Sequence, residues 1–340
     1  MPEALDAIFV KQYVRMEDKK EGEKILSKIV DQMVDSLLNV TWMTQETRDT
    51  SIKKIKESVY KIGFPDFMVN DTYLDSLYSL VNISNDDYFG NVINLNKVSR
   101  RRMNNLIKNM GSRSAWSYHV YDPQVEYINV WQELIATAAI LQSPLFDYEG
   151  PDYYNFGAIG TLLARNLIHA VDEYGGSYKL DGSNLGLWWD EDTTSRYLNV
   201  QQCAVDAQRN ERAGPYVISG KTYWINISSS AESNAAEMLA DASGLRMSYK
   251  AYKLVEKEKG REILPAGIHK YTADQLFFVA YAQVYCQSAP DVVLLAQHLL
   301  DKYPLKNKIN LAMSHVPEFH SAFKCQAGQR MHVNTPCTLF

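Results

Sequence analysis

The N-terminal part of the chain carries the hydrophobic period of amphipathic helices. Between residues 21 and 59, apolar side chains recur every three or four positions among charged ones. The recurring positions include Ile25, Ile29, Met33, Leu37 and Leu38. Residues 73–80 and 91–107 show the same period, whereas 60–65 interrupts it with Gly63 and Pro65. The pattern predicts a helical region at the start of the chain.

After residue 115 the pattern changes to short segments rich in Tyr, Val and Ile. Residues 117–121 and 125–131 predict strands, and three later segments, 157–171, 231–256 and 272–286, predict helices. The most apolar stretch, 276–300, contains Gln283, Pro290 and Asp291, so it predicts a pair of buried helices rather than a membrane span. We therefore expect a mainly α fold with a small β component (α+β), divided into residues 1–115 and 116–340.

Composition narrows the class of protein. The 340 residues include 35 Lys and Arg, 40 Asp and Glu, and 46% hydrophobic side chains, with a net charge of −5. This is globular composition with no basic patch, so it argues against a nucleic-acid partner. Residues 1–20 contain Glu3, Asp6, Lys11 and Arg15, and this interruption of apolar sequence predicts no signal peptide and no transmembrane segment in the chain.

Cysteines and glycosylation sequons favour an oxidising compartment. None of the four cysteines forms a C-x-x-C pair, so disulfides are a better interpretation than a zinc or redox site. Four N-x-[ST] sequons suggest a glycoprotein. They begin at Asn39, Asn70, Asn82 and Asn226.

Two predicted helices carry side chains that could do chemistry. Arg165 and His169 share one helical face, and Glu237 and Asp241 share a face of a later helix. Two carboxylates four residues apart repel each other, so a cation beside them is expected. Considered alone, the first pair is better explained by a core or surface histidine, and the second by a solvated helix face.

The order and spacing of many short segments resemble the neprilysin and endothelin-converting enzyme family of zinc metallopeptidases. The matching segments are 38–43, 62–66, 139–142, 155–160, 276–278, 282–286, 317–319 and 322–325, with a Cys337-x-x-aromatic end. The whole chain resembles the C-terminal half of such a protein. The resemblance implies a thermolysin-like (gluzincin) metallopeptidase domain over 116–340, preceded by part of a helical lid domain over 1–115.

The family's zinc motif is degenerate in this sequence. The family uses H-E-x-x-H, with two zinc ligands and a general base, and E-x-x-x-D, with a third ligand and an outer-shell carboxylate. The resemblance places Arg165 at the first ligand, Asn166 at the base, His169 and Glu237 at remnant ligands, and Asp241 in the outer shell. A guanidinium has no lone pair to donate, and an amide cannot accept a proton from water.

The resemblance also assigns substrate-binding positions and disulfides. The family's N-A-x-Y on the substrate-binding strand falls on Gln124, Val125 and Tyr127, and its transition-state His and substrate-binding Arg fall on Lys302 and Lys308. The family pairing implies a Cys203–Cys337 disulfide. Cys286 and Cys325 match cysteines that bond to the absent N-terminal half, so they are free thiols, mispaired, or signs of a fragment.

These substitutions predict a pseudopeptidase that needs no cofactor, although Zn²⁺ serves the family. We expect Arg165 to pair with Glu237, with Asp241 as a second candidate partner, and the chain to bind peptides or an unknown protein. One alternative is an active zinc metalloendopeptidase with a non-standard metal site, using Glu173 or Asp241 as an extra ligand. The other is a truncated, non-functional fragment. The resemblance implies an extracellular or cell-surface location.

Overall fold

The computed structural model describes residues 1–108, 113, 115–184, 186–264, 266–268, 270–301 and 303–340. Its N-terminal part consists of three helices, α1 (Pro2–Tyr13), α2 (Met16–Asn39) and α3 (Gln45–Glu57). The apolar face predicted for α2 is buried, with Ile29, Met33 and Leu37 at 0% exposure. Thr44 begins α3 by accepting a hydrogen bond from the backbone N–H of Thr47. The helical start of the chain is therefore confirmed.

A three-stranded sheet joins segments from both sides of residue 115. The strands are β1 (Val59–Gly63), β2 (Val125–Ile128) and β3 (Glu133–Thr137), in the order β1-β3-β2. β1 runs parallel to β3, and β2 runs antiparallel to it, which leaves β2 at an edge. The division at residue 115 stays a prediction, but β1 shares this sheet with strands that follow it.

Two strand predictions were wrong in this region. Residues 60–65 were expected only to interrupt a helix, yet Val59–Gly63 is a strand, and Gly63 with φ of +77° lies at its end. Residues 117–121 were expected to be a strand and form none. Instead, Val120 donates its N–H to Asp6 and accepts a hydrogen bond from Ala139, so its polar groups are satisfied outside a ladder.

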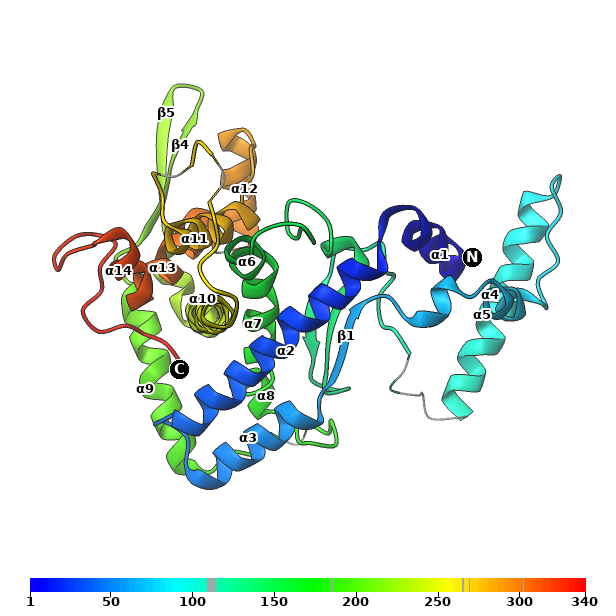
Figure 1. Ribbon diagram of the computed structural model, residues 1–340, viewed down its shortest axis with the longest axis horizontal. Coiled ribbons are helices and arrows are strands. Elements are labelled where there is room, and N and C mark those ends of the chain that lie inside the picture. The colour runs from blue at the N-terminus through cyan, green and yellow to red at the C-terminus, as the bar shows by residue number, and fades with distance from the viewer. Residues whose placement is uncertain (109–112, 114, 185, 265, 269, 302) are drawn as a thin grey trace.

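The centre of the molecule is a pair of packed helices, α7 (Thr161–Ile168) and α10 (Ala231–Lys259). Gly244 permits their close approach, because an added Cβ there would lie 2.7 Å from the backbone of Arg165. Around this pair lie shorter helices and α9 (Glu191–Gln208). The shorter elements are α6 (Asp152–Asn155), a π-helical turn (Phe156–Gly160) and α8 (Glu173–Gly176). Figure 1 shows α2 passing diagonally beside α7.

The C-terminal third adds four helices and a hairpin. They are β4 (Arg212–Ile218), β5 (Lys221–Asn226), α11 (Ala273–Val284), α12 (Asp291–Asp301), α13 (Leu305–Ser314) and α14 (Pro317–Phe323). The hairpin was not predicted from the sequence. The prediction of two buried helices in 276–300 holds for α11, but α12 exposes Leu299 and Leu300. No helix in the described parts of the chain has the length and apolar character needed to cross a membrane.

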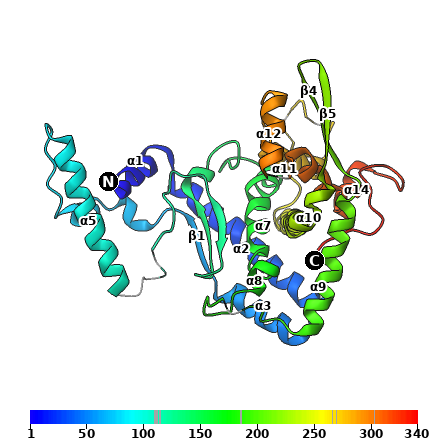
Figure 2. The same cartoon turned by 180° about the vertical axis from the view of Figure 1, so that it is seen from behind.

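Helices α4 (Asp71–Tyr78) and α5 (Tyr88–Lys108) lie at the end of the molecule farthest from α14 (Figures 1 and 2). Most other elements share one apolar core, which extends from Ile25 in α2 to Leu339 near the C-terminus. A disulfide joins Cys203 in α9 to Cys337, as predicted. It closes a loop with a sequence separation of 134 and is expected to stabilise the fold by about 4 to 5 kcal/mol.

Candidate functional site

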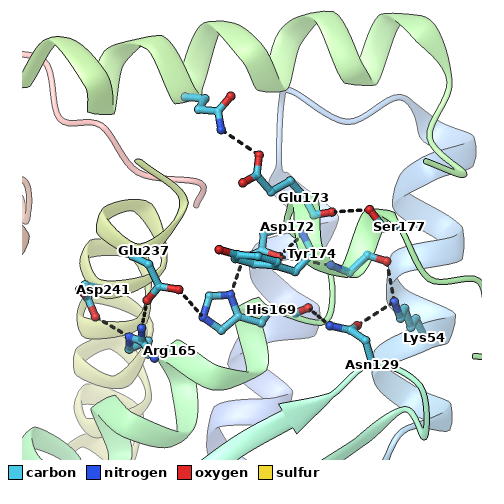
Figure 3. Close-up of polar contacts among 12 residues, drawn as sticks. Lys54, Asn129, Arg165, His169, Asp172, Glu173, Tyr174, Ser177, Glu237 and Asp241 are labelled. Carbon is cyan, nitrogen blue, oxygen red and sulfur yellow. Dashed lines mark hydrogen bonds and ion pairs between the residues drawn. The ribbon is translucent and has the colours of Figure 1, made fainter. Parts of the chain in front are cut away.

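Helices α7 and α10 bring the predicted zinc-motif residues together (Figure 3). Arg165 on α7 donates from Nη2 to Oε2 of Glu237 and from Nε to Oδ1 of Asp241, the latter at 2.6 Å. Both carboxylates project from α10, one turn apart. The guanidinium is thus the cation that the two like charges were expected to need.

A second cation stands on the far side of Asp241. Lys308 on α13 places Nζ 3.3 Å from Oδ2 of Asp241 and 5.2 Å from the ring centroid of Tyr285. The side chain of Asp241 is fully buried, so both of its oxygens face a positive charge in a low-dielectric setting. Burial by itself would lower the pKa of Arg165, but the attraction of Asp241 outweighs it and raises the pKa. The guanidinium of Arg165 therefore stays protonated.

His169 lies at the end of α7 between two carboxylates. Its Nδ1 is 2.6 Å from Oδ2 of Asp172, and its Nε2 is 3.9 Å from Oε1 of Glu237. Asp172 also caps α8, because its other oxygen accepts hydrogen bonds from the N–H groups of Tyr174 and Gly175. The result is one row of polar contacts through the site, in the order Lys308, Asp241, Arg165, Glu237, His169, Asp172.

Asn166 stands where the family's general base was predicted. Its Nδ2 donates to the backbone oxygen of Leu162 at 2.8 Å, and the residue is 7% exposed. An amide in this position has no basic lone pair with which to take a proton from water. The site supplies no general base at this residue.

The donor set does not fit a catalytic zinc ion. Such a site uses three protein ligands, whereas here Arg165 engages the carboxylate of Glu237 and leaves His169 as the remaining nitrogen donor. Among the residues that the structure describes, no group of three or more His, Cys, Asp or Glu side chains could hold a metal ion. Glu173, the alternative ligand, bonds to Gln201 at 2.8 Å, and its pKa is raised by burial. Figure 3 shows its carboxylate directed away from His169.

A cavity of about 360 Å³ opens between the site and the edge strand β2. Its lining residues are Glu126, Tyr127, Ile128, Asn129, Val130, Asn166, His169, Tyr174, Tyr178 and Glu237. Of the predicted substrate-binding residues, Gln124 and Val125 lie at the start of this strand, whereas Lys308 is held at Asp241. Lys302 lies outside the described residues.

Backbone geometry leaves part of β2 open to a partner. The N–H of Thr137 donates to the oxygen of Gln124 at 3.0 Å, and bonds between antiparallel strands alternate along the chain. By this alternation the polar backbone groups of Glu126 face β3, and those of Val125 and Tyr127 face the edge of β2 that pairs with no strand in the described residues. An extended peptide could pair with that edge.

Sequence reasoning missed two residues that shape the site. Lys54 on α3 is 1% exposed, and Asn129 after β2 donates to the backbone oxygen of His169 at 3.0 Å. A signal for Lys54 was available, because a 3.6-residue period places it on the same helix face as the buried Thr47, Ser51 and Ile55. For Asn129 the sequence offers no comparable signal.

Comparisons with known proteins match this chain to one family of peptidases. A model of peptidase family M13 matches residues 126–339, and a second model of the same family matches residues 1–65. Neprilysin-3 of Drosophila melanogaster is 29% identical over 338 residues, 99% of this chain and 42% of the relative. Endothelin-converting enzyme-like 1 of Homo sapiens gives the same four figures. The chain spans less than half the length of these relatives.

Solved structures show the same fold. The zinc metalloprotease ZMP1 of Mycobacterium tuberculosis in its open state superposes with a TM-score of 0.83 at 21% identity, covering 98% of this chain and 49% of that one. The first family model alone matches more than half of the chain. The chain therefore belongs to peptidase family M13, the family of neprilysin and the endothelin-converting enzymes.

Proposed function

We propose that this chain is a pseudopeptidase, a member of a zinc peptidase family that binds peptides without hydrolysing them. The observation that carries the proposal is the position of Arg165. Its guanidinium bonds to Glu237 and Asp241, the carboxylates that the family's motif assigns to the third ligand and the outer shell. A fixed positive charge there excludes a metal ion by repulsion and by occupying its donors.

Asn166 removes the second requirement of the reaction. Peptide hydrolysis in this family needs a base to activate water, and the amide of Asn166 is already engaged with Leu162. The two losses are independent, because one concerns metal binding and the other proton transfer. Regaining either function alone would not restore activity.

Peptide binding is supported by features that need no metal. The edge of β2 offers backbone donors and acceptors at Val125 and Tyr127, and the adjoining cavity has room for side chains. Glu126 in the cavity wall favours a peptide with basic residues, and the apolar side chains of the same wall favour apolar ones. A nonapeptide of three Ala-Leu-Lys repeats, labelled with fluorescein, is a suitable probe.

We also propose an extracellular or cell-surface location. The Cys203–Cys337 disulfide suits an oxidising compartment. The four sequon asparagines are all exposed, so each could carry a glycan. They are Asn39, Asn70, Asn82 and Asn226.

Zinc stoichiometry in two variants tests the loss of the metal site. Wild type, supplied with excess Zn²⁺ and then desalted, is expected to retain close to none. Arg165→His with Asn166→Glu rebuilds H-E-x-x-H beside His169 and Glu237, and it is expected to retain one zinc per chain and to cleave the nonapeptide. Adding His169→Ala to the double variant is the control that should remove this zinc. One zinc in wild type, lost with His169→Ala, would contradict the proposal and favour a non-standard active site.

A further inference from the structure

Lys54 is a buried side chain whose amino group contacts no carboxylate directly among the residues that the structure describes. Its Nζ donates to the backbone oxygens of Gly175 at 2.8 Å and Tyr178 at 3.0 Å, and to Oδ1 of Asn129 at 3.4 Å. Three N–H donors thus meet three oxygen acceptors, so the buried group is satisfied. Burying a charged group costs several kcal/mol unless the surroundings compensate. A charged side chain is therefore an unusual donor to backbone oxygens in the interior.

The three acceptors belong to two segments beside the cavity, one at the end of β2 and the other at residues 169–178. Gly175 lies in α8 and Tyr178 follows it, in the segment that carries Tyr174 into the cavity. Asn129 directly follows the edge strand, and its Nδ2 donates to the backbone oxygen of His169. Figure 3 shows Lys54, Asn129 and His169 joined in one row of contacts. One side chain from α3 therefore contacts both segments.

We infer that Lys54 is a positioning residue, which sets the separation between β2 and the segment 169–178 and thereby keeps the cavity in a shape that accepts a peptide. The inference rests on the proposed peptide binding. It concerns a helix, α3, that contributes no side chain to the cavity lining.

The protonation of Lys54 gives this arrangement a dependence on pH. Burial lowers the pKa of Lys54 to about 7, against the opposing attraction of Asp172. Asp172 is the charged group that acts on Lys54 from the elements packed against it within the described residues. Above this pH the neutral amine has two N–H donors for three acceptors, so the hydrogen bond to one of the two segments is lost.

Trp188 reports on the contact independently of any peptide. Its Nε1 donates at 3.0 Å to the backbone oxygen of Gly175, the same atom that Lys54 contacts. The indole N–H resonance of Trp188, assigned with Trp188→Phe, is expected to shift with a midpoint near pH 7 in wild type. Lys54→Met and Lys54→Arg should abolish that midpoint, and Lys53→Met, an exposed neighbour on α3, should retain it. A midpoint that persists without Lys54, or no shift from pH 6 to 8.5 in wild type, would overturn the inference.

Affinity for the nonapeptide at pH 6.5 separates positioning from simple stability. Lys54→Met is expected to bind about tenfold more weakly, and Lys54→Arg, which keeps the charge, within about threefold of wild type. Asn129→Ala removes the link to His169 and leaves Lys54 two carbonyl contacts, so it tests the inference even if Lys54→Met does not fold. It should weaken binding and keep the Trp188 midpoint; unchanged binding in Asn129→Ala would refute the link. Absence of binding by wild type, with the Trp188 midpoint present, would refute peptide binding instead.

Discussion

The two walls of the cavity present different kinds of groups. The helix wall, formed by α7 and α10, presents charged side chains, among which Arg165 is paired with Glu237 and Asp241. The strand wall, formed by β2, presents backbone groups that no substitution short of proline removes. The interactions that the helix wall can make thus depend on the identity of its side chains, whereas those that the strand wall offers do not.

Close packing of α7 and α10 brings Arg165 to both carboxylates of the helix wall. Gly244 permits this packing, so the guanidinium of Arg165 reaches Glu237 and Asp241. The same closeness makes the pair obligatory: the side chain of Asp241 is 0% exposed and cannot turn to water. Arg165 is the cation on which this buried carboxylate depends.

Removing that cation is expected to have the largest effect. Arg165→Met leaves the buried charge of Asp241 with Lys308 alone, and breaking a buried pair on one side costs about 3 to 5 kcal/mol of the free energy of unfolding. Urea denaturation at pH 7 measures this loss. Arg209→Met removes an exposed pair with Asp206 and should cost under about 1 kcal/mol.

A double variant sharpens the result. Arg165→Met with Asp241→Asn removes both charges and should recover part of the stability, whereas a cost equal to the sum of the single variants would show that the two residues do not interact. A cost for Arg165→Met no larger than that of the exposed control would contradict the account of the helix wall. Peptide binding on the strand wall should survive in every variant that folds.

Lowering the pH should reduce the free energy of unfolding through His315, which lies at the end of α13, next to α10. This residue caps α13, and its Nδ1 accepts a hydrogen bond from the N–H of Cys337 at 2.9 Å, which secures the tail that also bonds to Ser243 on α10. Burial, with a smaller contribution from His320, lowers the pKa of His315 to about 4. Between this pKa and the usual value near 6.5, the unfolded chain binds a proton that the folded chain does not, so the stability falls as the pH drops.

The difference between the two pKa values corresponds to roughly 3 kcal/mol, which is lost progressively as the pH falls from about 6.5 to 4. His315→Gln, which cannot titrate, should flatten this part of the curve of unfolding free energy against pH. Urea denaturation at pH 7, 5.5 and 4.5 measures both slopes. Equal slopes in the variant and wild type would remove His315 as the cause.

The sequence predicted the helix wall better than the strand wall, for a physical reason. The pairing of Arg165 with Glu237 and Asp241 follows from two helices whose faces are set by a local period of 3.6 residues, once the family resemblance brings the helices together. Strand pairing depends on partners far along the chain. β1 pairs with β3 over 70 residues away, so no local pattern revealed it.

The roles of Lys308 and Lys54 were hidden for the same reason. Lys308 was predicted to bind substrate, but the structure places it against Asp241, a contact between α13 and α10 that spacing cannot show. The exposed face of α12 was mistaken for a buried one, because an apolar run reveals composition and not what covers it. The local hydrophobic period predicts helices and strands. Charge pairing depends on how elements that are far apart in the sequence pack together.

The smallest expected effect tests whether the strand wall acts through its backbone. Val125→Pro removes one N–H from the unpaired edge at the first residue of β2, a position where proline is tolerated, so the fold should persist. The lost hydrogen bond should weaken binding of the nonapeptide about tenfold, measured by fluorescence anisotropy. Val125→Ala is the matched control, because it trims the side chain and keeps the N–H, and it should bind as wild type does. If both variants weaken binding equally, the side chain of Val125 carries the recognition, and the contrast between a side-chain wall and a backbone wall fails.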